Sequence, residues 1–341
     1  MQSPTMQSVS KLDRQKANKR KSAPKVKEST RTTQQKAKKR KTAPKVKEST
    51  RNWLDLPGDL TGNILQRIGV IDMLDNAQKV CTTWHKICKE PSMWKVIQLD
   101  IPSGSRYTRS QLRKICKNVV DRSQGQLVDI KIVDFADDDL LKYIADRASH
   151  LTCLEIACCY GMNGTWTEAL NKLSSLEELS LHKTGITKEA IENVGWCCPL
   201  LKILKVNQDP LKYPDETDAN NLSIAIGKNL HELRHLELIG NSMTNIGLEA
   251  ILDGCHHLEL LDLRKCFYVD VKTDLGKRCS QQIKYLKLPN DSLDGCPYIY
   301  ENDSDNDPYA DLYCDCGLTP TDSDDARDNW TAFYMDYYSL L

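Results

Sequence analysis

Cysteine and histidine are the side chains in this sequence that could perform nucleophilic or metal chemistry. The chain has 14 Cys and 7 His, but no two cysteines form the C-x-x-C pair of a zinc ribbon. Cys314 and Cys316 flank one Asp with no His nearby, and His256-His257 precede an apolar repeat. The sequence contains neither a Gly-rich phosphate loop nor G-x-S-x-G. We therefore expect no catalytic residue, no metal site and no cofactor, and so no enzyme.

The composition narrows the class of protein further. No apolar run approaches the roughly 18 residues that a membrane-spanning helix needs, and the polar, basic start lacks the apolar core of a secretory signal. We therefore expect no membrane contact, and reduced thiols in a nuclear or cytosolic protein.

Charge is distributed unevenly, although the formal net charge is zero. Residues 1–51 hold 17 Lys and Arg against 3 Asp and Glu, whereas residues 290–341 hold 1 Arg against 13 Asp and Glu. The head is nearly free of apolar residues, and residues 291–328 are rich in Asp, Asn, Ser and Pro. Such segments bury too little surface to offset their chain entropy. We predict disorder in the basic head and in this part of the acidic tail.

The basic head is an internal duplication. Residues 15–31 recur as residues 35–51 with two differences. Each copy carries a basic cluster of the kind that serves as a nuclear import signal. The residues of the two clusters are Lys19, Arg20, Lys21, Lys38, Lys39, Arg40 and Lys41. We predict import into the nucleus. Attraction to nucleic-acid phosphates and a solvated head without a role are the alternatives, but no aromatic residue lies among these charges to stack on bases.

The end of the acidic tail has a different pattern. Its aromatic and apolar residues recur at the spacing of one helix face: Trp330, Phe333, Tyr334, Tyr337, Tyr338 and Leu341. We predict a helix that either caps the preceding domain or binds a partner.

Residues 52–95 have the pattern of several short helices. Leu56-Pro57 opens the first helix, and Gly69 stands where a left-handed turn would end it. Asp72 is placed to cap the next helix, and Pro91 stops the pattern. Because a domain this short is marginally stable alone, we expect it to dock on another domain.

This segment resembles the F-box motif. The family pattern L-P-x-x-L, I-L, V-C-x-x-W and a final W is matched in order and spacing by Leu56-Pro57, Leu60, Ile64-Leu65, Val80-Cys81, Trp84 and Trp94. The resemblance implies binding to a Skp-type adaptor, which links F-box proteins to a cullin and to ubiquitin transfer. It also implies an adaptor-facing surface that includes Leu56, Pro57, Leu60, Ile64 and Leu65. We expect the two tryptophans to pack in the core.

The following residues form a repeat array. The pattern L-x-x-L-x-L occurs seven times, with starts at residues 127, 151, 176, 201, 233, 258 and 283. Alternation places the second and third apolar residues on one face of a short strand. Helix patterns follow, as in residues 187–197 and 244–253. One such unit cannot bury its apolar face alone, whereas stacked units can.

The array resembles a leucine-rich-repeat solenoid of the cysteine-containing subclass that is common beside F-boxes in plant proteins. The resemblance implies an α/β fold with parallel strands on a concave face and helices on a convex face. Cys159, Asn241 and Cys266 follow their repeat's first Leu by eight residues, where a small polar side chain can bond backbone between coils. The predicted domains are a basic head (1–51), a three-helix F-box (52–98), the solenoid (99–289) and an acidic tail (290–341).

We place the target-binding site on the concave face. Strand residues between and after the Leu positions point to that side, and their charges are mixed in sign, which suits a protein or peptide better than a uniform polyanion. The centre of an interface usually contributes most of the binding energy. We therefore predict that the target contacts the residues of the middle coils: His182, Lys205, Asn207, Glu237, Ile239 and Arg264. An insertion at residues 207–219 is expected to form a loop beside them. The convex helices are the alternative site.

These features together predict the substrate-recognition subunit of a Skp–cullin–F-box ubiquitin ligase. The F-box would bind the adaptor, and the solenoid would bind an unidentified target protein. One alternative is a nuclear protein-binding scaffold that acts outside ubiquitination. Another is a small-molecule sensor like the F-box hormone receptors, which resemble longer solenoids.

Overall fold

The structure is a computed structural model that describes residues 56–100, 107–159, 162, 165–210 and 218–299. The predicted import clusters, the disorder of the head and of the tail after residue 299, and the helix at residues 330–341 all lie outside these residues. So does most of the insertion at residues 207–219.

Three short helices begin the described chain, as the F-box resemblance implied. They are α1 (Gly58–Leu65), α2 (Val70–Asp75) and α3 (Thr82–Ile87), joined by 3₁₀ turns η2 (Gln66–Ile68) and η3 (Ala77–Lys79) and followed by η4 (Pro91–Trp94). Gly69 has the positive φ, 85°, that its position predicted. The prediction that Asp72 caps the second helix was wrong. That helix starts at Val70, so Asp72 lies in its first turn, where it accepts a hydrogen bond from Asn76 at 2.8 Å.

In the described part of the chain, eight parallel strands follow and pair in the order of the sequence. They are β1 (Val96–Leu99), β2 (Asp129–Val133), β3 (Cys153–Ala157), β4 (Glu178–His182), β5 (Ile203–Asn207), β6 (His235–Glu237), β7 (Leu260–Asp262) and β8 (Tyr285–Lys287). The register aligns the same position of successive repeats, for example Ile130 with Leu154 and Leu154 with Leu179. The predicted repeat unit is therefore the structural unit.

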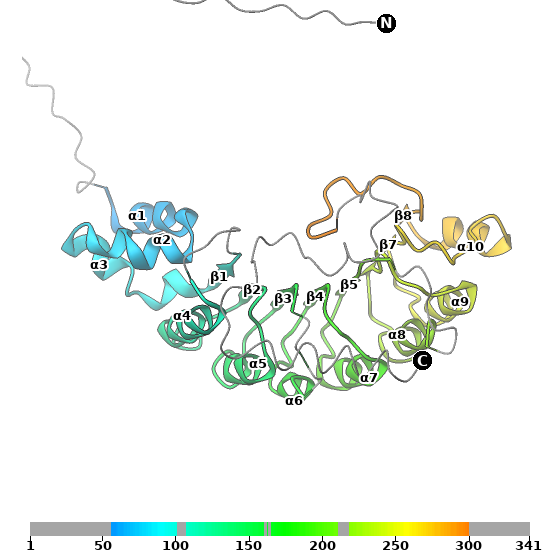
Figure 1. Ribbon diagram of the computed structural model, residues 1–341, viewed down its shortest axis with the longest axis horizontal. Helices are drawn as coiled ribbons and strands as arrows, with labels where there is room; N and C mark the ends of the chain where they lie inside the picture. Colours follow the sequence, from blue (N-terminus) through cyan, green and yellow to red (C-terminus); the bar gives the residue numbers. More distant parts are fainter. Residues whose placement is uncertain (1–55, 101–106, 160–161, 163–164, 211–217, 300–341) are drawn as a thin grey trace, which may run out of the picture. The chain divides into compact units, whose positions relative to one another are not determined.

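The described helices α4 to α10 lie on one face of this sheet, and the strands line the other face, which we call the open face (Figure 1). The helices are α4 (Arg109–Arg122), α5 (Asp138–Ala145), α6 (Thr167–Leu170), α7 (Lys188–Cys197), α8 (Asn221–Asn229), α9 (Asn245–Gly254) and α10 (Asp274–Gln282). The predicted helices at 187–197 and 244–253 are α7 and α9. Thr187 and Thr244 cap them by accepting hydrogen bonds from backbone N–H groups.

The F-box helices and the repeats share one continuous core. Leu65 and Trp94 belong to the same buried cluster as the repeat residues Leu154 and Leu261. Trp94 is fully buried, its indole N–H donates to the carbonyl of Cys88 at 3.0 Å, and the Arg122 guanidinium of α4 lies 5.5 Å from its ring. The expected docking of the short domain is therefore confirmed, because the first coil completes its core.

A repeated turn ends the strands. The residue directly after the strand or its extension has positive φ at Asp134, Cys158, Lys183, Gly240 and Lys265. This turn redirects the chain from the open face toward the helices. Only Gly adopts such a conformation without strain. At Gly240 a side chain is also excluded by the neighbouring backbone. A side chain at that position would begin 1.9 Å from the carbonyl oxygen of Gln208 in the preceding coil.

The next residue of the turn is buried, and the sequence predicted that its side chain bonds backbone between coils at Cys159, Asn241 and Cys266. Asn241 instead accepts from the backbone N–H of Met243 in its own coil at 2.9 Å. The Cys159 thiol accepts from the backbone N–H of Ala136 at 3.3 Å, and Cys266 donates to the carbonyl of Leu238 at 2.9 Å. Burial raises the pKa of both thiols to about 12. These cysteines are therefore protonated structural groups that join adjacent coils.

Candidate functional site

The F-box helix α1 presents an apolar stripe that nothing in the described chain covers. Leu60 is 48% exposed and Ile64 is 40% exposed, one helical turn apart, and Ile68 continues the stripe. Pro57 is exposed beside it and Leu56 is half-buried. Large apolar side chains gathered on a surface mark an interaction site, so four of the five predicted adaptor residues lie where a partner can reach them.

Leu65 is the exception among the predicted adaptor residues. It is 1% exposed and belongs to the buried core cluster. Each residue advances about 100° around a helix, so Leu65 faces inward although Ile64 faces solvent. Its side chain supports the stripe from beneath. Val80, which the motif match did not assign to the surface, is 63% exposed at the end of the α2–α3 connection.

The predicted target residues of strands β4 to β7 do gather on the open face. The Lys205 ammonium lies 2.7 Å from a carboxylate oxygen of Glu178. Glu237 accepts a hydrogen bond from the Asn207 amide at 3.2 Å and lies 2.9 Å from the His235 ring nitrogen. Burial alone would raise the pKa of Glu237, but these hydrogen bonds and Lys205 outweigh it and bring the pKa to about 2. The carboxylate is therefore ionised at neutral pH.

Two predicted residues are buried within this network. Asn207 is fully buried, with its amide nitrogen 3.3 Å from the ring of His182 and its oxygen accepting from the backbone N–H of Ile239 at 3.0 Å. Burial lowers the pKa of His182. Asn207 thus joins three adjacent coils, which is a structural role that alternation along one strand does not reveal.

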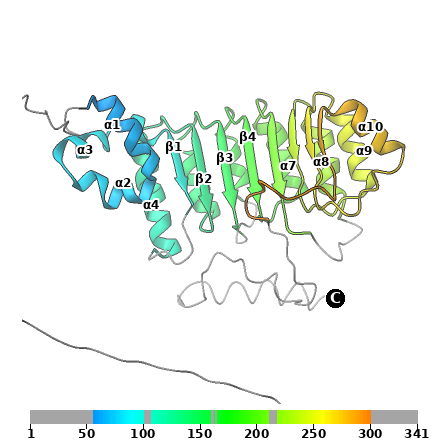
Figure 2. The same ribbon diagram turned by 90° about the horizontal axis from the view of Figure 1, so that it is seen from above.

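The cover over these residues comes from residues 289–299, which we call the strap. Figure 2 shows this orange segment crossing the open face from β8 toward β4. It packs Leu293 and Ile299 against Ile239. The Arg264 guanidinium donates to the Ser292 carbonyl at 2.7 Å. Of the six predicted target residues, only Lys205 and Glu237 keep partial exposure.

The strap also differs from the expectation for residues 291–299, which the sequence assigned to a disordered tail. The expectation rested on composition averaged over a long acidic segment. The local sequence contains apolar residues at the positions that meet the sheet, and their burial offsets the ordering of the short segment.

Comparison with known proteins agrees with this geometry. A family model described as an F-box domain matches residues 53–96. F-box protein SKIP19 of Arabidopsis thaliana is 43% identical over 80% of this chain and 87% of that protein. F-box/LRR-repeat protein 21 of the same plant is 40% identical over 72% and 84%.

The chain belongs to the F-box/leucine-rich-repeat family. F-box/LRR-repeat protein 23 of Arabidopsis thaliana is also 43% identical, over 71% of this chain, and the match spans about half (54%) of that protein. Among solved structures, the yeast Rad7–Elc1 complex gives a TM-score of 0.43 at 14% identity, over 66% of this chain and 58% of that chain.

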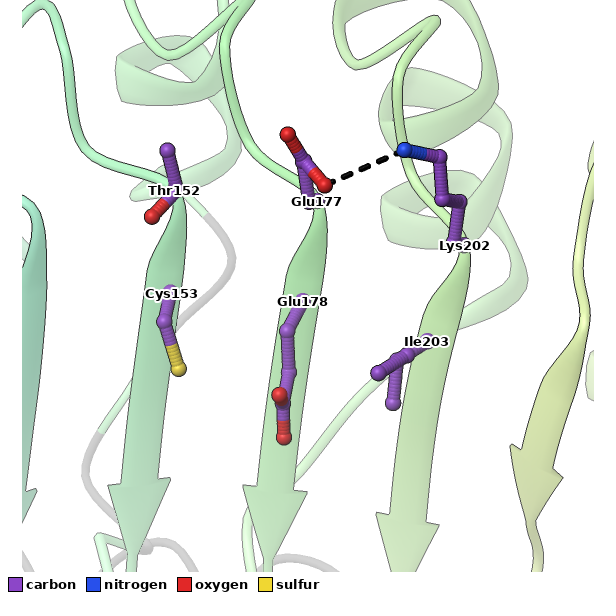
Figure 3. A pocket seen from close by; sticks show the side chains of 6 residues that line it. All are labelled: Thr152, Cys153, Glu177, Glu178, Lys202 and Ile203. Atoms are coloured by element: carbon purple, nitrogen blue, oxygen red, sulfur yellow. Dashed lines mark hydrogen bonds and ion pairs between the residues drawn. The ribbon is translucent and has the colours of Figure 1, made fainter.

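A shallow depression of about 300 Å³ lies at the starts of three strands of this F-box/leucine-rich-repeat protein (Figure 3). Its lining residues are Thr152, Cys153, Glu177, Glu178, Lys202 and Ile203. Lys202 and Glu177 pair across it at 3.1 Å. Burial and then the Asp129 carboxylate raise the pKa of the Cys153 thiol to about 12. A protonated thiol is a poor nucleophile, so the depression has no evident catalytic group.

Two further kinds of feature were not found in the described residues. Among them, no group of three or more His, Cys, Asp and Glu side chains is placed to hold a metal ion. In the same part of the chain, no helix has the length and apolar character needed to cross a membrane.

Proposed function

We propose that this protein is the substrate-recognition subunit of a Skp–cullin–F-box ubiquitin ligase. The observation that carries the proposal is the exposed stripe of Leu60, Ile64 and Ile68 on a domain whose core is already complete. The F-box match and the relative F-box protein SKIP19 support it, because the F-box is the part of such a subunit that would bind the adaptor. The adaptor would cover the stripe, and a cullin would follow through the adaptor.

The role of this chain in ubiquitin transfer is positional. The F-box anchors the chain and the open face holds the target, so that lysines of the target are kept near the ubiquitin donor. The gain is effective concentration rather than chemistry by residues of this chain.

The charge pattern of the open face favours a protein target. Lys131 and Lys205 alternate along the sheet with Glu155 and Glu237. Alternating signs repel a uniform polyanion about as often as they attract it, whereas a segment with complementary charges gains specificity.

The ligase assignment is tested by purifying the tagged full-length chain from cells. We expect a Skp-type adaptor and a cullin to co-purify, and ubiquitin-remnant profiling of cells that lack the chain to reveal targets that lose ubiquitin. Recovery of neither the adaptor nor the cullin would contradict the F-box role. Recovery of the adaptor without a cullin would favour the scaffold that acts outside ubiquitination.

The position of the target site is tested by charge reversal. Lys205→Glu places a third carboxylate beside Glu178 and Glu237 on the open face, and we expect it to raise the level of the target in cells. Lys188→Glu on the exposed surface of α7 is the matched control. The opposite result, with stabilisation by the control alone, would move the site to the helices. Arg264 is unsuitable for this test because it is buried against Asp262.

A further inference from the structure

The strap places one tyrosine against three strands of the open face. The ring of Tyr298 lies 5.3 Å from the ring of His182, and the Lys131 ammonium lies 5.2 Å from its centroid. Its hydroxyl donates a hydrogen bond to Glu155 at 3.4 Å. The apolar side chains of the cluster beneath it include Val133. Residues from strands β2, β3 and β4 thus surround a single phenol.

Two further contacts hold the strap, and they differ in kind. Leu293 and Ile299 form an apolar anchor on Ile239. Arg264 binds the main chain of the strap: its Nη1 donates to the carbonyls of Ser292 at 2.7 Å and Asp294 at 3.3 Å. Bonds to carbonyl oxygens do not depend on the side chains of the bound segment, whereas the contacts of Tyr298 select one side chain.

The backbone of the strap is strained where the tyrosine enters. Tyr298 has φ of 67°, a conformation that residues other than Gly rarely adopt. The turn lets Tyr298 reach β2 to β4 while Ile299 reaches Ile239 at the end of β6. Strain of this kind persists only where surrounding contacts impose it. The contacts of the phenol with Lys131, Glu155 and His182 are the contacts that do so.

We propose that the open face binds a short peptide segment through a tyrosine subsite formed by Lys131, Glu155 and His182, and that the strap is its intramolecular occupant. A target presents a tyrosine on an accessible segment and takes the place of the strap. The proposal rests on the proposed function only for the role of the open face in recruiting targets.

The subsite favours an unmodified tyrosine over a phosphorylated one. The hydroxyl of Tyr298 needs an acceptor, and Glu155 supplies it. A phosphate would bring about two negative charges next to that carboxylate, with Asp100 also paired to Lys131 at 3.3 Å. Burial raises the pKa of Tyr298, so the phenol keeps the proton that it donates.

Occupancy by the strap sets the affinity that a target must exceed. A short tether gives an effective concentration of about 1 mM. For a peptide with an intrinsic Kd of about 0.1 mM, the strap weakens apparent binding by roughly tenfold.

The experiment measures binding of a fluorescent peptide with the sequence of residues 289–299 to two full-length proteins. One is the wild type, and the other is a strap variant that carries Leu293→Ala, Tyr298→Ala and Ile299→Ala. We expect the strap variant to bind the peptide about tenfold more tightly, because its subsite is vacant. A peptide with Ala or phosphotyrosine in place of the tyrosine should bind the strap variant about tenfold more weakly than the parent peptide.

Controls separate recognition from packing. Tyr285→Ala removes an exposed aromatic residue of β8 and should leave peptide binding at the wild-type level. Adding Lys131→Ala to the strap variant should weaken binding of the tyrosine peptide more than that of the Ala peptide. Thermal unfolding of each protein verifies that it is folded.

The proposal is overturned if the strap variant gains no affinity, if millimolar peptide does not bind it, or if the tyrosine and Ala peptides bind alike. A fall in Tm of the strap variant without any gain in peptide affinity would mean that the strap is only a packed cover. Adaptor binding is measured on the same proteins. If neither the wild type nor the strap variant binds the adaptor, the ligase assignment is contradicted, but the peptide result still stands.

Discussion

Replacing Leu60 and Ile64 of the F-box by Ala should weaken adaptor binding without unfolding the protein. Close to half of each side chain is exposed, and full burial of such a side chain contributes about 1.5–3 kcal/mol. Covering the exposed half of both therefore contributes about 2 kcal/mol after the remaining Ala methyl groups are allowed for. This corresponds to roughly a 30-fold loss of affinity.

The measurement is calorimetric titration of a purified Skp-type adaptor into the wild-type chain and into the double variant. Two single variants serve as controls. Leu65→Ala removes a buried side chain and should lower the free energy of unfolding by about 2–5 kcal/mol. Ile246→Ala removes a more exposed apolar side chain (62%) from α9, on the surface of the repeats, and should leave adaptor affinity unchanged.

Two results would refute this reasoning. If the folded double variant binds the adaptor within about twofold of the wild type, the stripe on α1 is not the adaptor surface. If Ile246→Ala weakens binding as much as the double variant does, exposed apolar area anywhere on the chain accounts for the effect and the F-box has no special role.

Three further predictions concern the head, the open face and the repeat turns. Deleting residues 11–31 should leave a tagged chain nuclear in microscopy while deleting 11–51 should not, because the duplicated clusters are redundant; a full-length chain that is already cytoplasmic would contradict import. Glu237 has a folded pKa of about 2, below its ordinary 4.5, so its contribution is present above pH 4.5 and lost as pH falls toward 2. Glu237→Gln should lower the unfolding free energy at pH 7 by up to about 3 kcal/mol and flatten its acid dependence in denaturant titrations; an unchanged acid limb would contradict this. Gly240→Ala should lower Tm by about 8 °C or more, because the new carbon meets the backbone of Gln208 and φ is 73°; a scan that matches the wild type would show that the turn relaxes.

The strands and their order were predictable because the repeat is a local pattern with a constant period. The seven copies predict seven strands. Leu154 pairs in register with Leu179 because stacked repeats align their equivalent positions. The eighth strand of the described sheet, β1, lies outside these seven copies and follows the F-box residue Trp94. The F-box helices were predictable for a similar reason, since the motif specifies both the apolar positions and their spacing.

Which side chains the partner can reach was less predictable. Ile64 and Leu65 are adjacent and equally apolar, and only the direction of α1 relative to the first coil decides that one is exposed and the other buried. Asn207 is a polar residue at the end of β5, which predicts exposure, yet it is fully buried among three coils. Alternation gives the side of the sheet on which a residue lies. It does not say whether another segment of the chain occupies that side.

The composition of the strap explains why the sequence predicted disorder for residues 291–299. Residues 289–299 consist mainly of Pro, Asn, Asp, Ser and Gly, with a few apolar residues spaced along them. Such a segment cannot bury enough surface against itself to fold, which is the reason that it reads as disordered. It needs a preformed surface, and the parallel strands supply one whose Ile239, Arg264 and Lys131 meet an apolar side chain, the main chain and a phenol in turn. A segment that orders only on a rigid surface behaves as a ligand does. This behaviour supports the proposal that the open face binds short peptide segments, of which the strap is the intramolecular example.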